Sequence, residues 1–251
     1  MFAGPNGSGK STLKSYLPAA LIGVYLNPDE MEQEIRKNGF LDFTAYGVTT
    51  TAAEVLPFLQ NSTFLKTSGL GAATRRLVFA ENRLEFGAVK INSYLATATN
   101  DFLRQRLLEQ KQSFTLETVM SHPSKVELLA QAQAVGYRTY LYFVATDDPT
   151  INISRVRSRV KLGGHAVPED RIETRYHRSL DLLMDAIRHT NRAYVFDNSG
   201  DNRDQKHTWL AEVTEGRKLE LKSDRIPAWF KRAVLDKITG AKPSQINDGA
   251  K

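Results

Sequence analysis

The residues with the clearest chemistry stand near the start of the sequence, in a glycine-rich run followed by a lysine and two hydroxyl residues. The run fits the P-loop pattern G-x-x-x-x-G-K-[ST] in full. Glycines let backbone N–H groups turn inward around phosphate oxygens, and a following helix directs its N-terminal dipole at the same anion. The predicted nucleotide-binding residues are Gly4, Pro5, Asn6, Gly7, Ser8, Gly9, Lys10, Ser11 and Thr12.

The polar residues that end this run have distinct expected contacts. Lys10 is placed to reach the β- and γ-phosphates of ATP, and the Ser11 hydroxyl is placed to bind Mg²⁺ on the terminal phosphates. Thr12, one residue further into the helix, can reach the α-phosphate. A glycine-rich turn without a ligand is the plain alternative, but it does not explain the Lys-Ser pair. The sequence therefore predicts ATP and Mg²⁺ as cofactors, with Ser11 as a metal ligand.

An aspartate follows the next predicted strand, residues 21–26. Pro28 suits the first turn of a helix that runs to Asn38, so Asn27 is the expected N-cap and Asp29 lies just inside the helix. An Asp in a first turn commonly only complements the helix dipole. At the carboxyl edge of a parallel sheet, where ligands bind, it could instead accept the proton of a substrate hydroxyl. Asp29 is therefore a candidate catalytic base and substrate-binding residue.

A second acid, Glu117, lies in the β-rich run 114–118, and a helix is predicted from residue 123 to residue 135. Glu117 is expected at the same sheet edge as Asp29, where it could bind a substrate. An exposed acid at the end of a strand is the alternative. Ser121, shortly after this strand, is a further candidate substrate-binding residue.

Basic residues are concentrated between residues 155 and 178, where seven Lys or Arg accompany three acids. At about 100° per residue, Arg155 and Arg159 share one face of a predicted helix, and Arg157 points nearly the opposite way. The loop 161–168 and the next helix, which carries Arg175, are typical of a lid. We predict that Arg155, Arg159 and Arg175 stabilise the charge of a transferring phosphoryl group. A solvated helix face is the alternative.

The predicted strands and helices alternate, which favours an α/β fold with a parallel sheet flanked by helices. Residues 137–144 form a continuous apolar run typical of a buried strand, and residues 193–196 form a last core strand with Asn198 near the adenine. The helical spacing of residues 40–112 predicts a helical substrate-binding insertion.

The expected domains follow from these elements. A kinase domain covers residues 1–200, with the insertion at about 40–112 and the lid at about 155–178. A C-terminal hairpin and helix cover residues 201–240, and residues 241–251 are predicted to be a disordered tail.

Composition excludes several classes of protein. The 251 residues contain 41% hydrophobic and 25% charged residues, as in globular proteins, and no cysteine, which excludes disulfides and thiolate zinc sites. No apolar stretch is long enough to span a bilayer, and no leader segment is recognisable, so a cytoplasmic protein without a membrane partner is expected. The net charge of +6 is concentrated in one segment, which suits a small phosphorylated ligand better than nucleic acid.

Only three residues precede the first glycine of the P-loop, fewer than a usual strand contains. We therefore predict that the true start lies upstream of Met1. An unusually short first strand, which would make the domain less stable, is the alternative.

Together, the runs GPNGSGKST, NPD, SFTLETVMS and RSRVKLGGHAVPEDRIETRYHRSL resemble the zeta-toxin-like family of P-loop kinases over about residues 1–200. This resemblance implies a kinase that uses ATP and Mg²⁺, and a small antitoxin as a partner protein. In zeta toxins proper the acceptor is UDP-N-acetylglucosamine. By the same resemblance, Lys10 and Ser11 match the phosphate and Mg²⁺ ligands, Asp29 matches the catalytic base, and Glu117 matches the acid that orients the substrate.

The sequence departs from the toxins proper in two places. The run from Thr118 to Ser121 lacks the arginine that follows the acid in the toxins, and the lid between Arg159 and His165 is shorter. Both departures weaken the assignment of UDP-N-acetylglucosamine. Two alternatives stay open: an ABC-like or other P-loop ATPase, and a nucleotide-binding or RNA-binding module without transfer activity.

Overall fold

The computed structural model describes residues 1–164, 166–200 and 207–240, which form two compact units. Unit 1 consists of Met1–Tyr16 and Thr118–Lys251, and unit 2 consists of Leu17–Glu117. His165 and the predicted tail 241–251 lie outside the described residues.

Unit 1 contains a mainly parallel sheet with helices packed against it, as expected for an α/β fold. Its elements are β1 (Phe2–Ala3), α1 (Lys10–Lys14), α8 (Ser124–Ala134), β7 (Tyr140–Ala145), α9 (Pro149–Lys161), α10 (Glu169–Asp181), α11 (Leu183–Arg188), β8 (Arg192–Asp197), β9 (Thr208–Thr214), β10 (Lys218–Leu221), α12 (Ala228–Phe230), the π-helical η2 (Lys231–Leu235) and α13 (Asp236–Thr239).

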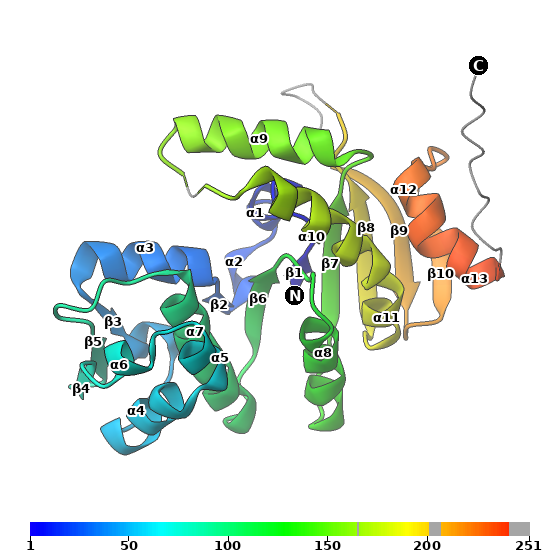
Figure 1. Cartoon of the computed structure of the whole chain (residues 1–251). Helices are drawn as coiled ribbons and strands as arrows, with labels where there is room; N and C mark the ends of the chain where they lie inside the picture. Colours follow the sequence, from blue (N-terminus) through cyan, green and yellow to red (C-terminus); the bar gives the residue numbers. More distant parts are fainter. Residues whose placement is uncertain (165, 201–206, 241–251) are drawn as a thin grey trace. The chain divides into compact units, whose positions relative to one another are not determined.

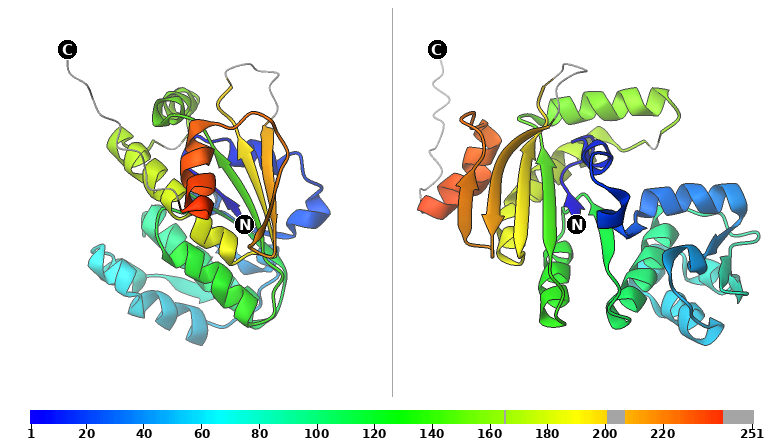
Figure 2. Two further views of the ribbon diagram at one scale, coloured as in Figure 1. Left: turned by 90° about the vertical axis from the view of Figure 1, so that its right-hand side faces the viewer. Right: turned by 180° about the vertical axis from the view of Figure 1, so that it is seen from behind.

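The strands of unit 1 lie side by side in the order β10-β9-β8-β7-β1 (Figures 1 and 2). β1, β7 and β8 are parallel, and β9 and β10 extend the sheet in the antiparallel direction. The hairpin predicted within residues 201–240 is confirmed: β9 and β10 pair in the antiparallel direction, with the turn at Glu215 and Gly216. It belongs to the same sheet as the strands before residue 200, because β9 pairs along β8 from Arg192 to Asp197.

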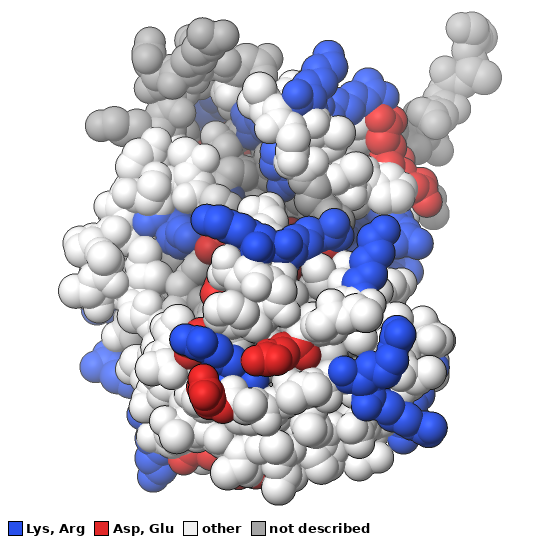
Figure 3. All heavy atoms as spheres, turned by 90° about the vertical axis from the view of Figure 1, so that its left-hand side faces the viewer, with Lys and Arg blue, Asp and Glu red and all other residues white. Residues whose placement is uncertain are grey.

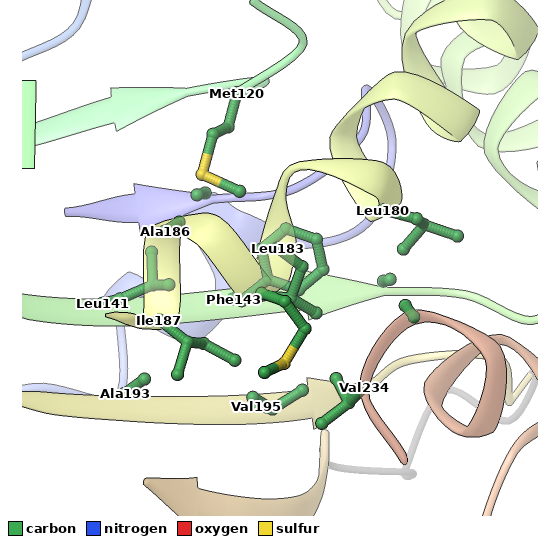
Figure 4. Packing of buried hydrophobic residues seen from close by; sticks show 14 of the residues in the cluster. Met120, Leu141, Phe143, Leu180, Leu183, Ala186, Ile187, Ala193, Val195 and Val234 are labelled. Atoms are coloured by element: carbon green, nitrogen blue, oxygen red, sulfur yellow. The ribbon is translucent and has the colours of Figure 1, made fainter. Parts of the chain in front are cut away.

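Alternate residues of the strands build the core of unit 1 on one face of this sheet. Leu141 and Phe143 from β7 and Val195 from β8 belong to one buried cluster with Leu183 of α11 and Val234 of the C-terminal helical segment (Figure 4). All five are fully buried. Burying such side chains stabilises a fold by about 1.5–3 kcal/mol each, so the C-terminal segment contributes directly to this core.

The opposite face of the unit 1 sheet carries a row of aromatic rings. Phe2 and Tyr142 stack with ring centroids 5.0 Å apart, Tyr142 and Tyr194 at 4.9 Å, and Trp209 follows 6.1 Å from Tyr194. Each ring comes from a neighbouring strand, from β1 to β9, so the row crosses the sheet and stabilises the pairing of its strands.

Unit 2 combines helices with a parallel pair of strands and a three-stranded antiparallel sheet. Its elements are α2 (Ala19–Ile22), β2 (Val24–Leu26), α3 (Pro28–Asn38), β3 (Phe40–Asp42), the 3₁₀ helix η1 (Phe43–Tyr46), α4 (Ala52–Asn61), α5 (Thr63–Thr67), α6 (Gly71–Thr74), β4 (Val78–Ala80), β5 (Arg83–Glu85), α7 (Ser93–Glu109) and β6 (Phe114–Thr118), the last of which ends in unit 1. β2 and β6 are parallel, and β3, β5 and β4 form an antiparallel sheet in that order.

Three predicted elements differ from the structure. The expected strand 21–26 begins only at Val24, because Pro18 starts a helical turn and Gly23, with φ of 57°, ends it. The insertion 40–112 is not purely helical: Glu81 and Asn82 both have positive φ, which allows the tight hairpin between β4 and β5. The C-terminal helix predicted within residues 201–240 contains a π-helical turn, η2, and Ile238 after this turn is 52% exposed.

Candidate functional site

The P-loop lies in unit 1, between β1 and α1. Its backbone needs glycine at positions where any side chain would collide. A Cβ on Gly4 would come within 2.0 Å of the Val144 carbonyl oxygen, and a Cβ on Gly9 within 2.3 Å of Asn198 Nδ2. Both residues also have positive φ, at 139° and 99°. The loop is therefore a tight turn whose shape depends on these glycines.

Lys10 lies inside this loop and is 7% exposed. Its Nζ donates hydrogen bonds to the carbonyl oxygens of Gly4 and Pro5, both at 2.9 Å. The ammonium group is thus held at the centre of the turn by its own backbone. Charged phosphate oxygens are stronger acceptors than carbonyl oxygens, so a bound phosphate would compete well for these donors.

A buried hydroxyl in the loop fits an anion. Ser8 Oγ is buried and has no hydrogen-bond partner in the described part of the chain. Burial of an unpaired hydroxyl is costly, and in a P-loop a phosphate oxygen is the usual acceptor nearby. Ser11 and Thr12 are exposed in the first turn of α1. The glycines, Lys10 and these hydroxyls together fit the phosphates of a nucleotide.

The loop is held from outside by two asparagines. Asn152, fully buried near the start of α9, donates from Nδ2 to the Asn6 carbonyl at 2.6 Å and accepts a hydrogen bond from Thr146 Oγ1. Asn198, after β8, donates from Nδ2 to the Ser8 carbonyl at 2.8 Å. Asn198 was predicted from the sequence to lie near the adenine, whereas Asn152 was not predicted. Asn152 could have been found from its spacing, because it lies four residues before Val156 and therefore on the same buried face of the helix.

His207 also contacts the loop. Its Nε2 lies 3.0 Å from the Gly9 carbonyl oxygen, and its ring packs edge-on against Tyr16. Burial lowers the pKa of His207 below the ordinary 6.5, and the positive charge of Arg155 acts in the same direction, whereas the contact with Gly9 raises it. The neutral imidazole is therefore favoured beside the P-loop.

The three predicted arginines have different surroundings. Arg155 donates from its two terminal nitrogens to the carbonyl oxygens of Asn198 at 2.7 Å and Gly200 at 2.9 Å, so it holds the loop after β8. Arg159 lies near the end of the same helix and is exposed, and Arg175 in α10 is half-buried. Arg157 points elsewhere, as predicted, and pairs with Glu169 through two hydrogen bonds of 2.5 and 2.7 Å. This pair joins α9 to the beginning of α10.

Charge on the surface is mixed. Figure 3 shows Lys and Arg side chains in several groups on one face, with Asp and Glu side chains beside them. Mixed charge of this kind is typical of a solvated surface.

The two predicted acids belong to unit 2, where they follow β2 and lie near the end of β6. Asn27 caps α3 as predicted, and its Oδ1 accepts from the Asp29 N–H at 3.0 Å. Asp29 is exposed in the first turn, and Glu117 is half-buried. Tyr25 Oη donates to Glu117 Oε2 at 2.5 Å. Burial of the ring, and then the charge and the hydrogen bond of Glu117, raise the pKa of Tyr25 well above its usual range. The sequence analysis missed Tyr25, although its register with Thr115 places it diagonally opposite Glu117.

Ser121 lies in unit 1, in the turn after β6, and is half-buried. The turn is formed by Met120, whose φ is 53° and whose N–H donates to Thr118 Oγ1 at 3.0 Å. Met120 is buried in the core of unit 1, so this turn is fixed by packing as well as by the hydrogen bond.

Ser11 is the residue of this chain that would hold Mg²⁺, together with phosphate oxygens of the nucleotide. A hydroxyl and phosphate oxygens form the hard oxygen donor set that Mg²⁺ prefers. Within residues 1–164, 166–200 and 207–240 there is no group of three or more His, Asp or Glu side chains that could bind a metal by themselves. None of the helices described there combines the length and the apolar character needed to cross a membrane.

A P-loop after the first strand of a mainly parallel sheet, with helices packed against that sheet, defines the P-loop NTPase class. Within this class, the model of the zeta toxin family, a family of kinases, matches residues 95–207. The match confirms the resemblance to zeta toxins, and it includes Glu117, the arginines and Asn198. The P-loop and Asp29 precede the matched residues.

Two other comparisons found similar proteins. An uncharacterized protein of Haemophilus influenzae (strain ATCC 51907 / DSM 11121 / KW20 / Rd) is 30% identical over 69 residues, which are 28% of this chain and 49% of that protein. The chain therefore spans about half the length of the curated relative it matches. Among solved structures, the crystal structure of AvrRxo1-ORF1:AvrRxo1-ORF2 with sulphate ions aligns with 99% of this chain and 65% of its own, at a TM-score of 0.49 and 13% identity.

Proposed function

We propose that this protein is an ATP-dependent kinase of the zeta-toxin type, which transfers the γ-phosphoryl group to a hydroxyl of a small molecule. The proposal depends above all on one observation: the Lys10 ammonium group lies buried within a complete P-loop, in a chain whose residues 95–207 match the zeta toxin family. Lys10 would bind the β- and γ-phosphates, and Thr12 the α-phosphate.

In the proposed reaction, Asp29 accepts the proton of the acceptor hydroxyl and Glu117 orients that hydroxyl. These two roles come from the resemblance and from the chemistry of the carboxylates. Mg²⁺, held by Ser11 and the nucleotide, would neutralise charge on the terminal phosphates. Arg159 and Arg175 are assigned to the charge that develops on the transferring group.

Arg155 is assigned a related role through its neighbours. Because its guanidinium group holds the carbonyl oxygens of Asn198 and Gly200, it supports the loop that contacts the P-loop. Asn198 is proposed to border the adenine. Ser121 is proposed to contact the acceptor from the turn after β6.

The acceptor is proposed to be a nucleotide sugar, with UDP-N-acetylglucosamine as the first compound to test. The missing arginine between Thr118 and Ser121 makes a related acceptor equally worth testing. A small antitoxin protein is the proposed partner. We also propose that the protein acts on its substrates in the cytoplasm.

The experiment is a transfer assay with γ-labelled ATP. UDP-N-acetylglucosamine, other nucleotide sugars and NAD are offered in parallel to the wild-type protein, Lys10→Ala and Asp29→Asn. We expect label on one acceptor and its loss in both variants. Label released only as free phosphate, at a rate unaffected by Asp29→Asn, would favour an ATPase, and ATP binding without turnover would favour a nucleotide-binding module.

A further inference from the structure

Three side chains of unit 2 form one hydrogen-bonded chain that includes the candidate orienting acid. Asn27 Nδ2 lies 3.2 Å from Tyr25 Oη, and Tyr25 Oη lies 2.5 Å from Glu117 Oε2. The same Asn27 side chain contacts the backbone N–H of Asp29 at 3.0 Å. These hydrogen bonds thus join three elements of unit 2: the end of β2, the first turn of α3, and β6.

The direction of each hydrogen bond follows from the groups involved. A backbone N–H can only donate, so the Asn27 atom facing Asp29 is the amide oxygen. The other Asn27 atom is then the NH₂ group, which can only donate, so Tyr25 Oη accepts from it. The single proton of the Tyr25 hydroxyl is left for Glu117, whose carboxylate oxygen Oε2 accepts it. Both hydrogen bonds therefore point the same way: Asn27 donates to Tyr25, and Tyr25 donates to Glu117.

We propose that Tyr25 is a positioning residue for Glu117: its hydroxyl holds one carboxylate oxygen and thereby fixes the orientation in which Glu117 meets the acceptor. The role rests on the proposed kinase function, because Glu117 is the acid assigned to the acceptor there. Tyr25 acts through Glu117 and is not itself assigned to the substrate.

The surroundings of Tyr25 suit this role. Parallel pairing of β2 with β6 sets Tyr25 opposite Thr115, so the backbone fixes the distance from the ring to Glu117. Burial and the neighbouring carboxylate raise the pKa of Tyr25, which keeps its hydroxyl protonated as a donor. A hydrogen bond to a charged group is among the stronger kinds, and it limits the rotation of the acid.

The first test measures the contact without any substrate. The nine tyrosines of the full-length protein are replaced biosynthetically by 3-fluorotyrosine, and the Tyr25 fluorine resonance is identified by its loss in Tyr25→Phe. Glu117→Gln is expected to move this resonance. The matched control is Tyr46, whose Oη donates to Glu34 Oε2 at 3.1 Å. Glu34→Gln should move the Tyr46 resonance and leave that of Tyr25 in place. A Tyr25 resonance that ignores Glu117→Gln would overturn the proposal.

The second test separates positioning from folding. Tyr25→Phe is expected to raise the KM for the acceptor roughly tenfold or more, with the Kd for ATP unchanged. Tyr46→Phe also removes a Tyr–Glu hydrogen bond of unit 2 and should leave the acceptor KM unchanged. If Tyr25→Phe and Tyr46→Phe changed the acceptor KM equally, the role of Tyr25 would be merely structural, and the proposal would be overturned.

Failure of the proposed function gives a different result. If the wild-type protein transfers label to none of UDP-N-acetylglucosamine, other nucleotide sugars and NAD, the kinase proposal and the positioning role fail together. The fluorine measurement, by contrast, can overturn the Tyr25 contact even in a protein that transfers label normally.

Discussion

Asp29 combines two properties that a single substitution can separate. It lies in the first turn of α3, where any negative charge complements the helix dipole, and its N–H already bonds to the Asn27 cap. Only the carboxylate, however, could accept a proton. Asp29→Asn keeps the shape and the backbone cap and removes the base.

We therefore expect Asp29→Asn to retain the affinity for ATP while the transfer rate falls about 10²-fold or more. Calorimetric titration with ATP and the labelled-ATP assay measure the two quantities on the same sample. Thermal unfolding serves as the control, since loss of the dipole contribution alone changes stability only slightly. Transfer at the wild-type rate would rule out Asp29 as the base.

His207 links stability to pH. Its pKa is lowered in the folded protein, so the unfolded chain binds the proton first as the pH falls. The stabilisation is complete above the unfolded pKa of about 6.5 and is lost as the pH falls through the lowered folded pKa. Unfolding temperatures across this window should drop more steeply for the wild-type protein than for His207→Gln, whose side-chain amide can still donate to the Gly9 carbonyl. Parallel curves would contradict this prediction.

At the scale of helices and strands, the sequence predicted the elements with strong local signals. Local chemistry and tertiary structure agree at the Asn27 cap with Pro28, in the apolar run of β7 and in the C-terminal hairpin formed by β9 and β10. The three-residue strands β3, β4 and β5 were missed, because so short a segment shows no periodicity.

The candidate site was predicted unevenly for a related reason. The P-loop is a local motif, so its residues could be named from the sequence alone. Asn152 and Tyr25 act through contacts with residues 146 and 92 positions away in the chain, Asn6 and Glu117, and spacing along the sequence does not show such contacts. Arg155 was identified as important, but its bonds to two backbone carbonyls depend on the fold of the loop after β8.

The start of α9 shapes the P-loop through Asn152. Asn152→Ala leaves the Asn6 carbonyl and the buried Thr146 hydroxyl without this partner, which costs about 1–3 kcal/mol of unfolding free energy. Because Asn6 belongs to the phosphate-binding turn, we also expect ATP affinity to fall roughly tenfold. Denaturant unfolding and calorimetry measure the two effects. Ser154→Ala, an exposed change on the same helix, is the control. If Asn152→Ala bound ATP with unchanged affinity, the contact from α9 to the P-loop would not contribute to nucleotide binding.

At the scale of the whole molecule, the proposed roles are divided between the two compact units. The P-loop, the three arginines and Asn198 belong to unit 1, and the two acids with Tyr25 belong to unit 2. In the proposed kinase, unit 1 therefore supplies the nucleotide site and Ser121, and unit 2 supplies the base, the orienting acid and its positioning residue. Such a division lets the acceptor change through unit 2 without altering the nucleotide chemistry.

Unit 2 is a single continuous segment, Leu17–Glu117, and its length of 101 residues is a usual size for a domain. It contains its own buried aromatic cluster, with Phe43 packed against Phe79 and Phe102. Parallel pairing of β2 with β6 brings the two ends of the segment side by side. These features predict that residues 17–117 fold without the rest of the chain.

A matched fragment sharpens this prediction. Residues 40–112, the insertion expected from the sequence, lack α3, whose buried Met31 and Ile35 lie on a helix that contacts α7. Removing two such side chains takes away about 3–6 kcal/mol of stabilisation from burial, a large part of the stability of a small domain.

We expect cooperative thermal unfolding and dispersed amide NMR resonances for residues 17–117, and neither for residues 40–112. If residues 17–117 were also unfolded, unit 2 would depend on unit 1 for its structure, and the division of the molecule at Tyr16 and Thr118 would not be a division between independently folding parts.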